Sequence, residues 1–165
     1  MTHPNPPMRR LVLVLLLAAT ALSARAADAE FVRVWSQWHP ALDFKRISEY
    51  FTDHENFSHK IIVRSQPASR AGYYFLARVR HPAFDLAGGK FVLHVITPAG
   101  PVAREFTFPV PAECPPGVHV FQLGLTGSDW PMKGTHPVAW RLELLSADGR
   151  ILVAQQSYLW SKPDK

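Results

Sequence analysis

The chain has 165 residues, with 18 Lys and Arg against 13 Asp and Glu, which gives a formal net charge of +5. This length suits one domain with a single hydrophobic core. No extended run of Lys and Arg provides the basic footprint that a nucleic-acid-binding surface needs, so nucleic acid is not an expected partner.

The first 26 residues have the three parts of an export signal. Met8-Arg9-Arg10 is a basic start, Leu11 to Leu22 is an apolar run, and Ala24-Arg25-Ala26 offers small residues for cleavage. The apolar run is shorter than the ~20 residues that span a bilayer as a helix. We therefore expect residues 1–26 to be a cleaved signal peptide and the protein to be periplasmic or extracellular.

The remaining chain is expected to be a single domain, residues 27–165. Removal of Arg9, Arg10 and Arg25 leaves 15 basic and 13 acidic residues, a net charge of +2. Cys114 is the one cysteine, so no internal disulfide is possible. It lies in a proline-rich connection without a basic neighbour in sequence, which favours an inert, buried thiol.

Strand-like segments recur between turn signals throughout the mature chain. In Val138–Leu144 apolar and charged residues alternate, which is typical of a strand with one buried and one solvated face. Asp148-Gly149 suits a tight hairpin between the last two strands. The predicted strands are 31–38, 60–66, 72–80, 90–98, 103–109, 118–126, 138–146 and 150–160.

One segment has helical rather than strand periodicity. Phe44, Ile47 and Phe51 share one face of a short amphipathic helix over residues 43–52, and Asp43 is a candidate N-cap. A helix this short needs a docking surface to persist, so we expect it to cover an end or flank of the strands.

The number of strands and the turn spacing resemble those of immunoglobulin-like and fibronectin-like modules, without the paired cysteines of true immunoglobulin domains. The predicted fold is all-β: an immunoglobulin/fibronectin-like antiparallel β-sandwich of about seven or eight strands, with one short helix near the N-terminus.

Motifs for catalysis are missing from the sequence. There is no Gly-x-Ser-x-Gly nucleophile motif, and the histidines are scattered. His54 and His59, with Glu55 between them, are weak candidates for a metal or hydrolytic site around residues 53–59. The nearby acids Glu49, Asp53 and Glu55 alternate with basic residues and are expected to be solvated. We therefore predict a protein that is not an enzyme and has no cofactor.

Tryptophans are the other candidate functional residues. Trp130 follows Asp129 in a loop, where its ring either plugs the end of the sandwich or stands exposed, and burial is favoured for so large a ring. Trp35 and Trp38 are three residues apart, so in a strand they lie on opposite faces. An exposed ring beside Asp129 is suited to stacking on a sugar.

Arg78 and Arg80 share one face of a predicted strand, and Arg33 or Arg64 could lie beside them. Together they would form a small basic patch, although cross-strand pairing on a solvated face is the expected arrangement.

These observations favour an exported, non-catalytic module that binds an envelope or secreted protein through a sheet edge or an aromatic end-loop. A carbohydrate-binding module using Trp130 and either Trp35 or Trp38 is the alternative. A metal-dependent or hydrolytic site around residues 53–59 is the second alternative. No transmembrane segment is expected in the mature chain.

Overall fold

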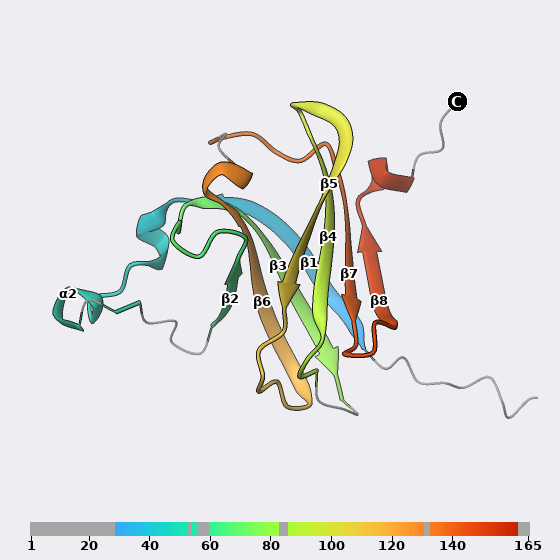
Figure 1. Ribbon diagram of the computed structural model, residues 1–165, viewed down its shortest axis with the longest axis horizontal. Helices are drawn as coiled ribbons and strands as arrows, with labels where there is room; N and C mark the ends of the chain where they lie inside the picture. Colours follow the sequence, from blue (N-terminus) through green and yellow to red (C-terminus); the bar gives the residue numbers. More distant parts are fainter. Residues whose placement is uncertain (1–28, 53, 56–59, 83–85, 131–132, 162–165) are drawn as a thin grey trace, which may run out of the picture.

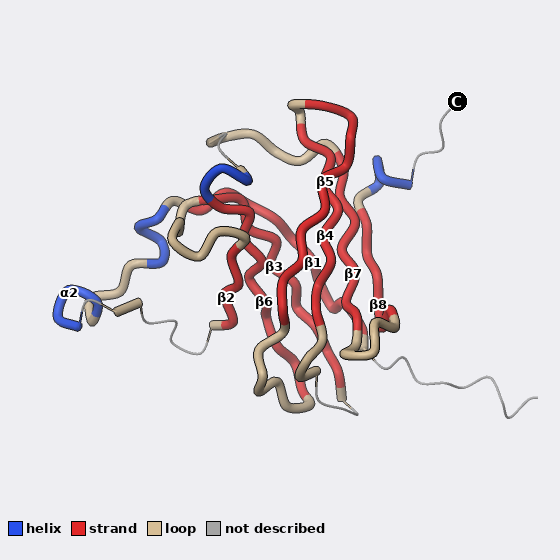
Figure 2. Tube along the Cα trace, in the orientation of Figure 1, coloured by secondary structure: helices blue, strands red, loops and turns tan. Residues whose placement is uncertain are grey.

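A computed structural model describes residues 29–52, 54–55, 60–82, 86–130 and 133–161. Eight strands form two layers, and the short helical segments lie at the periphery (Figures 1 and 2). The elements are β1 (Glu30–His39), η1 (Ala41–Phe44), α2 (Glu49–Thr52), β2 (Ile61–Arg64), β3 (Gly72–His81), β4 (Lys90–Thr97), β5 (Gly100–Pro109), β6 (Gly117–Thr126), η2 (Gly127–Asp129), β7 (Ala139–Leu145), β8 (Ile151–Gln156) and η3 (Tyr158–Ser161).

The two sheets have four strands each. The first sheet has the order β1-β3-β6-β2 and the second the order β5-β4-β7-β8. With β2 set aside, this is the A-B-E and C′-C-F-G arrangement of immunoglobulin-like sandwiches. The predicted fold class is therefore confirmed. One pairing departs from the antiparallel expectation, because β2 runs parallel to β6.

The core fills the space between the sheets. The side chains that alternate inward from both layers are fully buried, as the alternation in the sequence predicted. The largest of them are Tyr73, Phe75, Phe91, Phe108, Phe121, Leu93, Leu123, Leu125, Leu142 and Leu144. The hairpin between β7 and β8 turns at Gly149, whose φ of 83° is the left-handed conformation that glycine tolerates.

The outer face of the first sheet is only partly solvated. Tyr74 and Leu76 are buried together with Phe44 in a second, smaller cluster. Gly124 makes room for this packing, because a Cβ at that position would collide with the Tyr74 ring. The half of this face that carries Arg78 and Arg80 is exposed.

The predicted helix over residues 43–52 is wrong as a continuous element. The chain forms the 3₁₀ turn η1 and the four-residue helix α2, and Lys45 between them is extended, with φ −80° and ψ 126°. Asp43 does not act as a cap, because its carboxylate is bound to His39 Nδ1 at 2.8 Å. Of the predicted apolar stripe only Phe44 is buried, whereas Ile47 and Phe51 are exposed.

Along the described ranges, no helix has the length and apolar character that a bilayer crossing requires.

Candidate functional site

A group of charged and aromatic side chains attaches the segment after η1 to the outer face of the first sheet. Arg64 on β2 binds both carboxylate oxygens of Glu55, at 2.8 and 2.6 Å. Arg70 donates to Glu49 at 2.6 Å and lies 3.6 Å from Glu55. Tyr74 accepts a hydrogen bond from Arg64 Nε at 2.9 Å. We call these five residues the ionic cluster.

The ionic cluster is largely withdrawn from solvent, and this affects its ionisation. Burial raises the pKa of Tyr74, against the smaller, opposite influence of Arg64. Burial acts to lower the pKa of Arg64, but its bonds with Glu55 and Tyr74 outweigh this, and the pKa is raised. The raised pKa of each group thus keeps a neutral Tyr74 phenol beside a charged Arg64 guanidinium.

The sequence suggested that the acids of this region are solvated. For Glu49 and Glu55 this expectation is wrong, because both are paired with arginines. Glu49 is only 7% exposed. Its carboxylate accepts from Arg70 and also from the backbone N–H of Arg46, at 3.1 Å. The expectation overlooked Arg70 because it lies 21 residues away in the sequence. The result is that Glu49 points to the sheet and turns the rest of α2 outward.

The outward side of this segment carries four large hydrophobic side chains, which we call the apolar ridge. Leu42 is 76% exposed, Ile47 79%, Tyr50 69% and Phe51 85%. In Figure 1 α2 projects from one side of the sandwich, away from both sheets. So dense a group of exposed apolar side chains on about ten residues is unusual for a protein surface in contact with water.

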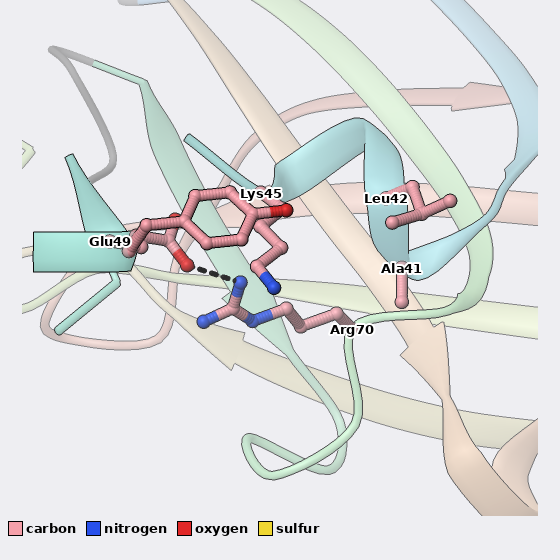
Figure 3. A pocket seen from close by; sticks show the side chains of 6 residues that line it. Ala41, Leu42, Lys45, Glu49 and Arg70 are labelled. Atoms are coloured by element: carbon pink, nitrogen blue, oxygen red, sulfur yellow. Dashed lines mark hydrogen bonds and ion pairs between the residues drawn. The ribbon is translucent and has the colours of Figure 1, made fainter. Parts of the chain in front are cut away.

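A pocket of about 470 Å³ lies between the ridge and the ionic cluster. It is lined by Ala41, Leu42, Lys45, Glu49, Tyr50 and Arg70. The close view shows the Glu49–Arg70 ion pair on one side and the apolar side chains of η1 on the other (Figure 3). Lys45 Nζ lies 4.1 Å from the centre of the Tyr50 ring, a cation–π contact. The pocket thus offers both apolar and cationic groups.

Trp130 is in the core rather than on the surface. Its ring is 2% exposed and lies 4.9 Å from that of Tyr73. Asp129 is paired with Arg104 of β5 at 3.0 Å. No face of the Trp130 ring is therefore open to a sugar.

The other two candidate tryptophans lie on opposite faces of β1. Trp38 packs against the main core, and half-buried Trp35 packs against the cluster on the outer face of the first sheet. Arg33 lies over the Trp35 ring at 5.2 Å. The structure does not bring the three rings together as a platform.

Only part of the candidate site around residues 53–59 can be placed. Asp53 and His59 lie outside the described residues. His54 is exposed, and Glu55 belongs to the ionic cluster.

The candidate basic patch is split. Arg33 is opposite Arg78 in the β1–β3 register, and Arg80 is paired with Glu30 at 3.3 Å. Arg64 lies in the ionic cluster instead. Cross-strand pairing therefore accounts for Arg80.

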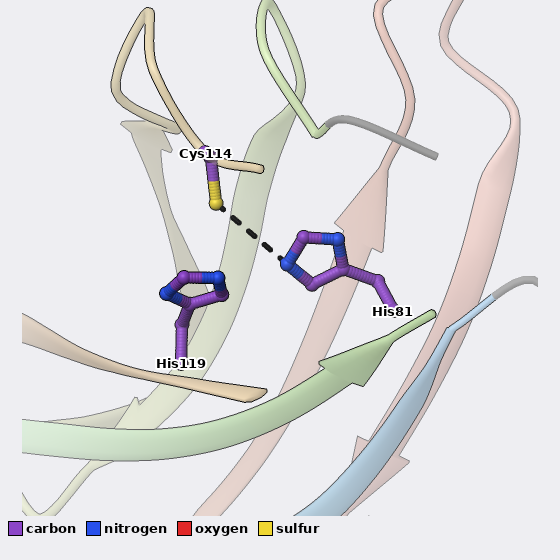
Figure 4. A group of neighbouring side chains, drawn as sticks. All are labelled: His81, Cys114 and His119. Atoms are coloured by element: carbon purple, nitrogen blue, oxygen red, sulfur yellow. Dashed lines mark hydrogen bonds between the residues drawn. The ribbon is translucent and has the colours of Figure 1, made fainter. Parts of the chain in front are cut away.

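Three residues that the sequence reasoning kept apart lie together at one end of the sandwich: His81, Cys114 and His119 (Figure 4). The sequence contains a partial signal, since His81 ends one strand, His119 lies near the start of another, and Cys114 lies in the connection leading to that second strand. Their spacing in the chain is not that of a known metal motif, so only the fold unites them.

These features define an immunoglobulin-like β-sandwich with an inserted, tethered segment between its first two core strands. No protein family matches the chain's sequence, and no curated protein matches it either. Among solved structures, an immunoglobulin-like protein from Pseudomonas aeruginosa is 15% identical, with a TM-score of 0.30. That comparison covers 81% of this chain and 97% of the other.

Proposed function

We propose that this chain is an exported, non-catalytic protein-interaction module of the cell envelope, and that it contacts its partner through the apolar ridge. The observation that carries the proposal is the exposure of Leu42, Ile47, Tyr50 and Phe51 on a segment that buried ion pairs attach to the sheet. Pre-ordering of this kind lowers the entropic cost of binding.

The chemistry of the ridge indicates the kind of partner. Large apolar and aromatic side chains supply most of the binding energy in protein interfaces when they fill pockets on the partner. Lys45 and Arg46 border the ridge, so we expect an apolar groove with acidic residues at its rim. We propose the apolar ridge as the binding surface in place of the sheet edge or the aromatic end-loop that the sequence suggested.

Export is supported by the composition of residues 1–26, with a basic start, an apolar run and a small-residue cleavage site. The non-catalytic part of the proposal is supported by the ionic cluster. Glu49 and Glu55 each bind a guanidinium group, so neither carboxylate is free to act as a general acid or base.

The test is capture of partners after mild crosslinking in the native host, using the full chain with a C-terminal tag. Three forms are compared: wild type, the Ile47→Ser/Phe51→Ser double variant, and Tyr158→Ser as a matched control, since Tyr158 is also 85% exposed but lies on η3. We expect one dominant protein with wild type and control, and its loss with the double variant.

Retention of the same protein by all three forms would contradict a role for the ridge. Retention of glycan without protein would favour the carbohydrate-binding alternative instead.

A further inference from the structure

At the end of the sandwich opposite the Trp130 loop, two strands and a connection bring three metal-binding side chains together. In the β3–β6 ladder Val79 is opposite His119 and His81 is opposite Gly117, so the two histidines occupy neighbouring positions on one face. Cys114 comes from the connection between β5 and β6. Figure 4 shows the thiol and both imidazole rings directed into the same space.

Two of the three donors, on His81 and Cys114, are held in place before any ligand binds. His81 and Cys114 are buried and His119 is half-buried, which leaves one side of the group close to solvent. The two rings stack with centroids 5.1 Å apart. The backbone N–H of Leu86 donates to the carbonyl of Cys114 at 3.2 Å and fixes the connection.

The distances suit a single metal ion. The ligand atoms of the three residues all lie within 4.8 Å of one another, and Cys114 Sγ is 3.8 Å from His81 Nε2. An ion about 2.3 Å from the sulfur and about 2.0 Å from the nitrogen would subtend an angle of roughly 125° between them, close to trigonal. Only small movements are therefore needed to complete coordination.

His119 is the ligand that has to adjust. Its Nε2 lies 2.9 Å from the carbonyl oxygen of Pro115. Coordination through this nitrogen requires the tautomer with its proton on Nδ1, and the ring must release the carbonyl. His119 is the most exposed of the three, so solvent can replace the hydrogen bond that its rotation breaks.

We propose that His81, Cys114 and His119 form a binding site for one cuprous ion. Thiolate and imidazole are ligands that copper and zinc both accept. Within the described ranges the cluster contains no carboxylate, so the Cys114 thiolate is its one anionic ligand. Cu⁺ and this thiolate give a neutral pair, whereas Zn²⁺ would leave a net positive charge in the core. Structural zinc also takes four protein ligands, and the described part of the chain supplies three.

The binding reaction is a simple exchange. Cu⁺ leaves the chelator or solvent ligands that held it, and the Cys114 thiol gives its proton to solvent. One Cu–S bond and two Cu–N bonds form, and no electron is transferred. This site is remote from the apolar ridge and does not depend on the proposed interaction function.

The experiment is an anaerobic titration of the purified protein with Cu⁺ in competition with a chromogenic Cu⁺ chelator, and a parallel titration with Zn²⁺. We expect one Cu⁺ per chain, a raised thermal unfolding midpoint and weaker binding of Zn²⁺. Cys114→Ser and His119→Gln should each lower the Cu⁺ affinity by at least ~100-fold, the upper range for loss of an outer-shell partner.

His94→Gln is the matched control, because His94 is a strand histidine that lies outside the cluster and beside Glu105 at 3.8 Å. The affinity of the His94→Gln protein for Cu⁺ should equal that of wild type. Circular dichroism establishes whether each variant is folded. If Cys114→Ser does not fold, the Cu⁺ affinity of His119→Gln tests the proposal. Three results would each overturn the proposal: no Cu⁺ binding by wild type, wild-type affinity in a folded Cys114→Ser or His119→Gln protein, or tighter binding of Zn²⁺ than of Cu⁺.

Discussion

Trp130 and Tyr74 are single rings that join peripheral segments to the two sides of the first sheet. Trp130 packs on Tyr73 and closes the end of the core after η2. Tyr74 follows Tyr73 on β3 and lies on the opposite face of the sheet. Its ring centre is 4.7 Å from that of Phe44, and its hydroxyl donates to the carbonyl of Arg70 at 2.6 Å. Each ring therefore fixes a loop that has little regular structure of its own.

Replacement of Trp130 by Ala should destabilise the protein by about 3–5 kcal/mol, because it removes a large buried ring and leaves a cavity. Urea denaturation measures this loss. The exposed control Tyr158→Ala should change stability by less than about 0.5 kcal/mol. A Trp130→Ala protein as stable as wild type would contradict the burial of the ring.

Tyr74 should make the fold sensitive to alkaline pH. Burial raises its pKa in the folded state above the ordinary value of about 10, so the native state holds this proton more tightly than the unfolded state. The corresponding stability is fully present below about pH 10 and is lost as pH rises through the folded-state pKa.

Urea midpoints between pH 8 and 11 test this effect. Tyr74→Phe should show a smaller decline with pH than wild type, while Tyr158→Phe should show the same decline as wild type. Equal pH dependence in wild type and Tyr74→Phe would rule out the expected contribution.

The segment between β1 and β2 is the element for which sequence and structure differ most. The periodicity of Phe44, Ile47 and Phe51 predicted a docked helix, but a helix of this length has little intrinsic stability, and long-range ion pairs decide its course instead. Arg70 and Arg64 follow this segment by many residues, so their pairing with Glu49 and Glu55 could not be deduced from local pattern. The exposure of the apolar ridge could not be predicted from the sequence for the same reason.

Replacement of Arg64 by Met should loosen this segment. The change leaves Glu55 without its bidentate partner and removes the donor to Tyr74, at an expected cost of about 2–3 kcal/mol, below the range for fully buried pairs. Amide hydrogen exchange in α2 should accelerate more than in β3 or β6.

Arg78→Met is the control for this experiment, because Arg78 is exposed and opposes Arg33 across the strands. It should be neutral or slightly stabilising, since it relieves like-charge repulsion. Unchanged exchange in α2 of Arg64→Met would show that the Arg64–Glu55 pair does not hold the segment.

At the scale of the whole molecule, strand-like segments and the turn signals between them located all eight strands, because the inward side chains share one core. The last predicted strand, 150–160, was too long: β8 ends at Gln156, and Tyr158–Ser161 form η3. The distribution of strands between sheets and the parallel β2–β6 pairing depend on chain topology and were not predictable from local pattern. The same holds for the group of His81, Cys114 and His119, which comes together only when β3, β6 and the connection meet.

The proposed export of this protein makes its own prediction. Protein recovered from outside the cytoplasm of the native host should begin at Ala27, as measured by intact mass and N-terminal sequencing. Ala26→Arg should block processing, because signal cleavage requires a small residue at that position. An exported protein that retains residues 1–26 would contradict the assigned cleavage site.

The most direct test of the central claim is site-specific photo-crosslinking in the native envelope, with the reactive side chain at position 51 of the ridge or at position 158 of η3. Both sites are 85% exposed in the wild-type chain, so they differ in location and not in accessibility. The account predicts one dominant protein adduct from position 51 and none from position 158. No adduct from position 51, or the same adducts from both positions, would contradict it.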